Sequence, residues 1–167
     1  MSESTPQVSP DDFKGALGSW AAGVTIVTTK DSGQVYGLTV SSFASLSVDP
    51  LLILVCIQNS NRLAEMAQSS QHFGVSILAQ GQDEISTFFA KSGRDPVPSY
   101  DHIETAEWHT GSPLISGAIA QLDCKLHEAV PGGDHTILIG KVVGATSDPS
   151  KEPLIYYRRG YRKLTDA

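Results

Sequence analysis

Hydroxyl side chains gather in one short stretch of this sequence, residues 39–47. Ser and Thr make up most of that stretch, and their hydroxyls are uncharged hydrogen-bond donors suited to a carbonyl-rich ring or a phosphate. Apolar residues alternate with them and change phase at Ser41 and Ser42, which predicts two strand pieces separated by a bulge or kink. A serine-rich bend at a barrel corner explains the same pattern without any ligand.

The segment Asn59-Ser60-Asn61-Arg62 predicts the start of a helix. Exposed backbone N–H groups, a hydroxyl and a guanidinium would meet there, and such groups together bind phosphate. The alternative interpretation is an ordinary N-cap followed by a solvated arginine.

A tight turn, Gly132-Gly133-Asp134, leads into His135. At the mouth of a barrel this imidazole can face a ligand and titrate near neutral pH. Asp134 would orient the ring, although adjacent strand residues point to opposite faces. The alternative is an ordinary surface histidine at the start of a strand.

Aromatic and basic residues alternate near the C-terminal end, in residues 156–162. Aromatic rings there would stack on a planar ligand, and arginines would hold its phosphate. A strand end with surface cations is the simpler interpretation.

Several familiar sites are missing from the sequence. No two glycines are separated by a single residue, so there is no Gly-x-Gly-x-x-Gly fingerprint, and neither a P-loop nor a Gly-x-Ser-x-Gly motif occurs. The five histidines show no metal-ligand spacing, so no metal site is predicted. Any phosphate must therefore be held by hydroxyls, arginines or a helix N-terminus.

Composition limits the classes of protein that remain. The 167 residues predict one domain, residues 1–167, with a flexible tail over residues 1–8. A net charge of −6 argues against nucleic acid, and the longest apolar run, seven residues, is too short to span a membrane. The polar N-terminal residues do not resemble a signal peptide, so a cytoplasmic protein is expected. Cys56 and Cys124 belong to no Cys-x-x-Cys pair and are expected to be reduced and buried.

These candidates must be positioned by a mainly β fold. Helices are expected from Ser9 and Pro10 onward, after Asn61, and over residues 81–90. The apolar face that includes Phe13, Leu17 and Trp20 is predicted to pack on the core. Strands are predicted at residues 23–29, 34–40, 51–58, 72–78, 117–130, 135–145 and 153–162. Many strands joined by hairpins, with few helices, predict a closed antiparallel barrel. The irregular residues 91–110 are either a mobile flap or an excursion that packs on a partner chain.

In this order, the segments resemble the short-chain flavin reductase family, the reductase components of two-component flavin-dependent monooxygenases. The resemblance covers about residues 10–164. Its matching pieces are Gly-Val-Thr-Ile-Val-Thr-Thr at 23–29, Gly-Leu-Thr-Val-Ser-Ser-Phe-Ala-Ser-Leu-Ser at 37–47, Asp-Pro at 49–50, Ser-Asn-Arg at 60–62, Phe-Gly-Val-Ser-Ile-Leu at 73–78, Gly-Gly-Asp-His-Thr-Ile at 132–137 and Tyr-Tyr-Arg-Arg-Gly-Tyr at 156–161. Arg159 departs from the family pattern, because a second glycine is expected before Gly160.

The resemblance implies an FMN-binding split β-barrel, Greek-key-like, with a few peripheral helices. It implies a homodimer that binds FMN or FAD, uses NADH or NADPH as hydride donor, and passes reduced flavin to a monooxygenase. It makes His135 the catalytic residue, beside the nicotinamide. The residues that it assigns to cofactor binding are Thr39, Val40, Ser41, Ser42, Ser45, Cys56, Ser60, Asn61, Arg62, Phe73, His135, Arg158, Gly160 and Tyr161.

Within that assignment, residues 39–42 touch the isoalloxazine ring, Ser60 and Arg62 hold the phosphate, and residues 158–161 close the site. Two rival functions stay open at this point. One is a non-catalytic flavin-binding protein with the same barrel, which would not need His135. The other is an oxidase of the pyridoxamine-phosphate oxidase type, for which the sequence offers no basic cluster.

Overall fold

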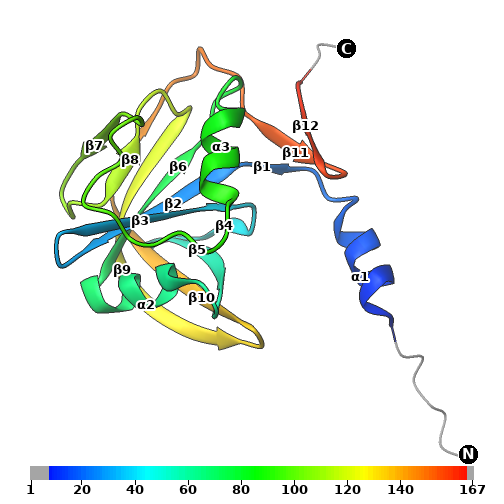
Figure 1. Cartoon of the computed structure of the whole chain (residues 1–167), viewed down its shortest axis with the longest axis horizontal. Coiled ribbons are helices and arrows are strands. Elements are labelled where there is room, and N and C mark those ends of the chain that lie inside the picture. The colour runs from blue at the N-terminus through cyan, green and yellow to red at the C-terminus, as the bar shows by residue number, and fades with distance from the viewer. Residues whose placement is uncertain (1–7, 165–167) are drawn as a thin grey trace, which may run out of the picture.

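A seven-stranded antiparallel sheet dominates the computed structural model, which describes residues 8–164 (Figure 1). Its strands are β2 (Thr25–Asp31), β3 (Gln34–Val40), β4 (Phe43–Val48), β5 (Leu51–Gln58), β6 (His72–Ile77), β9 (Ala120–Gly132) and β10 (His135–Ser147). They lie in the order β3-β2-β6-β9-β10-β5-β4. The predicted break at Ser41 and Ser42 is confirmed, since it separates β3 from β4.

The two edge strands, β3 and β4, are consecutive in the chain and are joined only by Ser41 and Ser42. The sheet must therefore curl until its edges approach each other. Within residues 8–164 no strand pairing joins these edges. The prediction of a closed barrel is thus confirmed only in its coarser form, a mainly β fold with antiparallel sheets.

Strand β5 shows how the sequence pattern selects the faces of the sheet. Ile53, Val55 and Ile57 are buried, whereas Leu54 and Cys56, which alternate with them, are only half-buried. Side chains alternate between faces along a strand, so the first set points into the core and the second points outward. A strand that is apolar on both faces needs a second covering for its outer face.

One close approach in the sheet requires glycine. A Cβ on Gly140 would lie 2.5 Å from Cζ of Phe73 and 3.0 Å from Cβ of Cys124. Phe73 is fully buried, and it occupies the space that a side chain at position 140 would need. The β9–β10 pairing also shifts register next to this residue, between Ile139 and Gly140.

Two helices pack on opposite faces of the sheet. Helix α2 (Arg62–Ser70) inserts Leu63, Ala64 and Ala67 into the main core cluster. Helix α3 (Asp83–Ala90) inserts Phe89 into a second cluster, with Val24, Ile26 and Leu154. The faces are opposite because α2 shares its cluster with Val27 of β2 and α3 shares its cluster with the adjacent Ile26. Both helices were predicted, and Asn61 caps α2 as expected, with its Oδ1 accepting from the Leu63 N–H at 3.1 Å.

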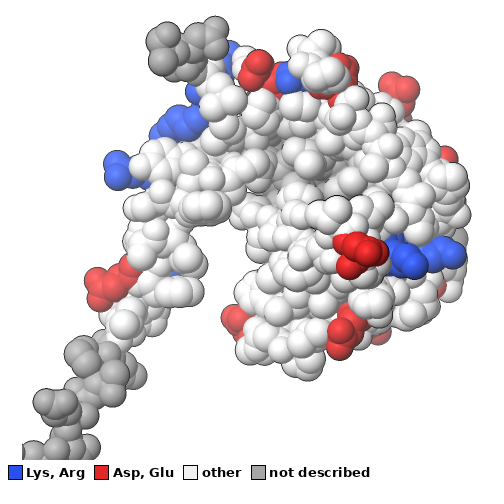
Figure 2. All heavy atoms as spheres, turned by 180° about the vertical axis from the view of Figure 1, so that it is seen from behind, with Lys and Arg blue, Asp and Glu red and all other residues white. Residues whose placement is uncertain are grey.

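An arm extends from the sheet (Figure 1). It consists of helix α1 (Pro10–Leu17) and a small sheet of β1 (Ala22–Gly23), β11 (Ile155–Tyr157) and β12 (Gly160–Arg162). Figure 2 shows an open, largely uncharged notch between the arm and the rest of the molecule. We call these four elements together the arm.

Two predictions about the arm are wrong. Helix α1 is capped by Ser9 as predicted but buries no residue, and Phe13, Leu17 and Trp20 are 58%, 57% and 76% exposed. The last predicted strand, residues 153–162, is instead a hairpin that turns at Arg158 and Arg159, with φ of 47° and 61°. The error arose because arginine rarely adopts a left-handed conformation, so the sequence carried no turn signal there.

Residues 91–110 pack on this chain's own sheet, which neither sequence-based expectation had described. The Val35 N–H donates to the Val97 carbonyl at 2.7 Å, and the Val97 N–H donates back at 3.1 Å. Arg94 donates to the Gly37 carbonyl at 2.5 Å, with its guanidinium over the ring of Tyr36. Short strands β7 (Thr105–Glu107) and β8 (Pro113–Ile115) then form a separate hairpin.

Candidate active site

Two neighbouring hollows lie between the arm and the seven-stranded sheet. The larger, about 690 Å³, is called the cleft here, and the smaller has a volume of about 270 Å³. Ser41 and Tyr156 line both, so the two hollows meet at these residues. The cleft is lined by Lys14, Leu17, Gly18, Trp20, Ala22, Ser41, Ser42, Phe43, Ala44, Leu54, Cys56, Tyr156, Tyr157, Arg158 and Arg159.

The predicted hydroxyl surface is brought to these hollows by the break between β3 and β4. Thr39 lines the smaller hollow, and its Oγ1 donates to the Ser86 carbonyl at 2.6 Å. The Ser42 hydroxyl lines the cleft and donates to the Cys56 carbonyl at 2.9 Å. The exposed Ser41 hydroxyl has no partner among the described residues. It therefore presents an unused donor and acceptor where the two hollows join.

Not every residue of this stretch faces the hollows. Val40 is only 5% exposed and belongs to the main core cluster, so only its backbone is available for a ligand. Ser45 is exposed on β4, opposite the inward-facing Ile53, and lines neither hollow.

Aromatic residues of the arm form the opposite wall. The rings of Tyr156 and Tyr161 meet edge to face, with centroids 5.6 Å apart. The Tyr161 hydroxyl donates to the Ser86 Oγ at 2.9 Å, which ties β12 to helix α3. Trp20 completes the wall from the N-terminal side. Flat apolar surfaces facing a row of hydroxyls suit a planar ring with polar edges.

The helix opening at Ser60 lies beyond both hollows. Ser60 and Arg62 are exposed, and Arg62 forms an ion pair with Asp95, with an Nη2–Oδ1 distance of 3.3 Å. Asn61 uses its side chain to cap the helix. Since exposed pairs of this kind are worth little, the guanidinium of Arg62 can exchange Asp95 for a phosphate at small cost.

His135 lies on the same face of the sheet as the cleft. It begins β10 opposite Gln58, and Ile137, two residues on, lies opposite Cys56. Because side chains two residues apart share a face, His135 lies about 7 Å along the strand from the position opposite Cys56. Its Nδ1 lies 2.7 Å from Oδ1 of Asp134, and this hydrogen bond lowers the pKa of the Asp134 carboxyl.

The two thiols have different surroundings. Cys56 is half-buried and lines the cleft, so the expectation of a buried thiol is wrong for this residue. Cys124 is fully buried, and burial raises the pKa of its thiol to about 12. Phe73, predicted to line the cofactor site, lies in the core and lines neither hollow.

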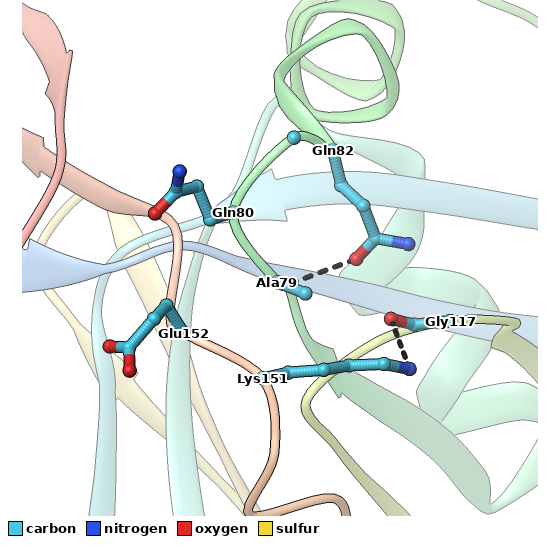
Figure 3. A pocket seen from close by; sticks show the side chains of 7 residues that line it. Ala79, Gln80, Gln82, Gly117, Lys151 and Glu152 are labelled. Atoms are coloured by element: carbon cyan, nitrogen blue, oxygen red, sulfur yellow. Dashed lines mark hydrogen bonds between the residues drawn. The ribbon is translucent and has the colours of Figure 1, made fainter.

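Another hollow of about 440 Å³ lies at the start of helix α3 (Figure 3). The Lys151 Nζ donates to the Gly117 carbonyl at 3.0 Å, and Gln82 joins the Ala79 N–H to the Ser116 carbonyl. The side chains of Lys151 and Gln82 are thus already engaged by the backbone of this chain. None of the predicted site residues lines this hollow.

Sequence reasoning missed several residues that line the two hollows. Tyr156 carried a signal as part of the aromatic C-terminal stretch, and Trp20 had one that was assigned to the core. Ser86 and Leu54 carried no sequence signal, because helix α3 and strand β5 meet the site only through the tertiary fold.

Across residues 8–164, no cluster of three or more His, Cys, Asp or Glu could hold a metal ion. None of the helices in that part of the chain is long and apolar enough to cross a membrane.

Comparisons with known proteins identify the family of this chain. Residues 17–165 match the family described as flavin reductase like domain. The NADH-dependent flavin reductase of a Rhodococcus species is 36% identical over 165 residues, which span 97% of this chain and 90% of the relative. The reductase component of 4-hydroxyphenylacetate 3-monooxygenase from Thermus thermophilus is 34% identical over 152 residues, spanning 91% and 95%.

A solved structure of the NADH:FAD oxidoreductase SgcE6 from Streptomyces globisporus is also similar. It superposes with a TM-score of 0.88 at 31% identity, covering 98% of this chain and 99% of that one. This chain therefore belongs to the flavin reductase family.

Proposed function

We propose that this protein transfers a hydride from NADH or NADPH to FMN or FAD, and that it supplies the reduced flavin to a partner monooxygenase. The observation that carries the proposal is the meeting of the two hollows at Ser41 and Tyr156, with hydroxyls on one wall and tyrosines on the other. The relatives named above are NADH-dependent or are monooxygenase reductase components, which supports the same reaction.

The residues present fit a flavin. The cleft and the smaller hollow together have room for one ring system with a second stacked on it. The unpartnered Ser41 hydroxyl suits a carbonyl or ring nitrogen at the edge of an isoalloxazine. When bound, flavin supplies the hydride acceptor. Thr39, Ser42 and the backbone of Val40 then orient its polar edge, and Ser60 and Arg62 bind its phosphate.

The protein contributes positioning more than proton transfer. Tyr156 and Tyr161 hold the rings from the arm side, and the bond from Tyr161 to Ser86 fixes their distance from the hydroxyl wall. His135 donates a hydrogen bond to the nicotinamide donor and aligns it, with Asp134 fixing the imidazole. Holding two rings in a reactive geometry removes much of the entropic cost of their encounter.

For the whole molecule, the proposal includes a split β-barrel that works as a homodimer in the cytoplasm. The homodimer is supported by apolar side chains that no other part of the described chain covers. On the β4–β5 hairpin, Leu46, Val48 and Leu51 are 46%, 81% and 55% exposed. Together with the exposed face of α1, they leave apolar surface that a second copy would cover.

The reaction is tested by following the absorbance of NADH or NADPH with and without added FMN or FAD. Oxidation that requires the flavin is expected. A protein that binds flavin but oxidises neither nicotinamide would be the non-catalytic carrier instead. Oxidation of pyridoxamine phosphate in place of a nicotinamide would indicate the oxidase.

A further inference from the structure

Positively charged side chains are concentrated on the arm. Five of the twelve Lys and Arg residues lie on it or directly after it. Three of these, Lys14, Arg158 and Arg159, line the cleft. The same three also line an adjoining hollow of about 350 Å³ between helix α1 and the β11–β12 turn. In a chain with a net charge of −6, this is a local reversal of sign.

These three cations are not engaged by carboxylates. Asp11 also lines the adjoining hollow, but within residues 8–164 no ion pair involves Lys14, Arg158 or Arg159. Among the described residues, the one partner for their charges is the ring of Tyr157, whose centroid lies 5.2 Å from Cζ of Arg158. Three like charges that converge without a counter-ion repel one another, and an anion between them would relieve that repulsion.

The backbone supports the same interpretation. Arg158 and Arg159 both hold left-handed conformations, which glycine or asparagine adopts at lower cost. Such a conformation is strained for a side chain with a Cβ. Retaining two arginines at this turn is consistent with a function for their charges.

We propose that Lys14, Arg158 and Arg159 form a subsite for the phosphate groups of the reduced nicotinamide dinucleotide. This inference rests on the proposed hydride transfer and extends it. The proposed flavin phosphate site, Arg62, lines neither the cleft nor the adjoining hollow. The hydride donor brings further phosphates while its ring must reach the flavin. A basic cluster that opens directly into the cleft meets that requirement.

The test uses Lys14→Gln, Arg158→Asn and Arg159→Asn, because asparagine keeps the left-handed turn while removing the charge. Lys125→Gln, an exposed cation on β9 that lines neither the cleft nor the adjoining hollow, is the control for net charge. With FMN as acceptor, we expect kcat/KM for NADH to fall about 5-fold in each single variant and about 25-fold in the Arg158/Arg159 double variant, as for exposed charge pairs. The control should keep the wild-type value.

Reduced nicotinamide riboside, which carries no phosphate, distinguishes a phosphate subsite from general damage. Its kcat/KM should be nearly unchanged in the same variants. NADPH locates the phosphate: an equal loss for NADH and NADPH indicates the diphosphate, and a larger loss for NADPH indicates the 2′-phosphate. Equal losses for the dinucleotide and the riboside would overturn the proposal, as would weaker FAD binding with unchanged kinetics for NADH.

A binding measurement separates this proposal from the proposed reaction. Calorimetric titration with ADP-ribose, which carries the diphosphate but no nicotinamide, requires no turnover. Binding to the wild type that the double variant loses supports the subsite even if no hydride transfer is found. Absence of any binding to an enzyme that does oxidise NADH would overturn the subsite and leave the reaction standing.

Discussion

At the scale of single residues, Arg62 has the most clearly separable role. It opens helix α2 with only the exposed Asp95 as a partner, so a phosphate can replace that carboxylate. We expect Arg62→Ala to weaken FMN binding about 10- to 150-fold, the range for a charge-assisted hydrogen bond of about 1.5–3 kcal/mol. Riboflavin, which lacks the phosphate, should bind nearly as before when both are titrated by fluorescence.

Asp95→Asn is the matched control for Arg62. It releases the guanidinium without removing it, so FMN affinity should stay the same or increase. Equal weakening of FMN and riboflavin by Arg62→Ala would mean that the substitution damages the fold and does not remove a phosphate contact.

His135 tests the catalytic assignment. We expect His135→Ala to lower kcat/KM for NADH about 10- to 100-fold, or about 1.4–2.7 kcal/mol, because the donor loses alignment. Flavin affinity and thermal stability should change little, since the side chain is half-exposed and begins a strand. Steady-state kinetics and flavin titration measure the two effects separately.

Asp134 offers a graded companion to that experiment. Asp134→Asn retains a group that can accept from His135 but removes the charge, so a smaller kinetic loss is expected than for His135→Ala. Wild-type kinetics in His135→Ala would instead indicate that His135 is an ordinary surface histidine.

At the scale of elements, the Phe73 ring of β6 reaches across β9 to Gly140 of β10, where a side chain is missing. Gly140→Ala would place a Cβ 2.5 Å from the buried ring of Phe73, so either the ring or the strand must move. We expect a loss of about 1–3 kcal/mol in the free energy of unfolding, measured by urea denaturation. Gly23→Ala, which meets nothing within 4 Å, is the control and should be nearly neutral.

The loop before β8 is held by a polar network around His72. Its Nδ1 lies 2.7 Å from Oγ of the buried Ser112, and burial lowers the pKa of this imidazole. A histidine whose pKa is lower when folded than when unfolded contributes stability above about pH 6.5, and that contribution is lost as the pH falls below it. Thermal melting should therefore show His72→Gln losing less stability between about pH 7.5 and 5.5 than the wild type. An equal loss would assign the acid sensitivity to other groups.

At the scale of the whole molecule, the unburied apolar surface predicts self-association. Val48→Glu with Leu51→Glu places two charges where a second copy is proposed to pack, on residues that are 81% and 55% exposed. We expect the wild type to have the mass of a dimer by light scattering, and the double variant to shift toward monomer with weaker flavin binding. Ser69→Glu, on the exposed side of α2, is the control. A fully active wild-type monomer would contradict the proposal.

Much of the fold follows from local sequence patterns. The alternation in residues 51–58, the cap at Asn61 and the tight turn before His135 each depend on neighbours within a few positions, and the structure contains each of them. The hydroxyl-rich break at Ser41 and Ser42 was visible for the same reason, because a change of phase in an alternating strand is a local signal.

The tertiary structure alone decided which of those residues meet. Ser86 reaches the site only because helix α3 packs beside β3, and Cys56 lines the cleft because alternation turns it away from the core. Helix α1 carries an apolar face that its sequence assigns to a core, but this chain's core has no place for it. Periodicity shows that a face is to be buried without showing what buries it, because burial depends on contacts between residues far apart in the chain.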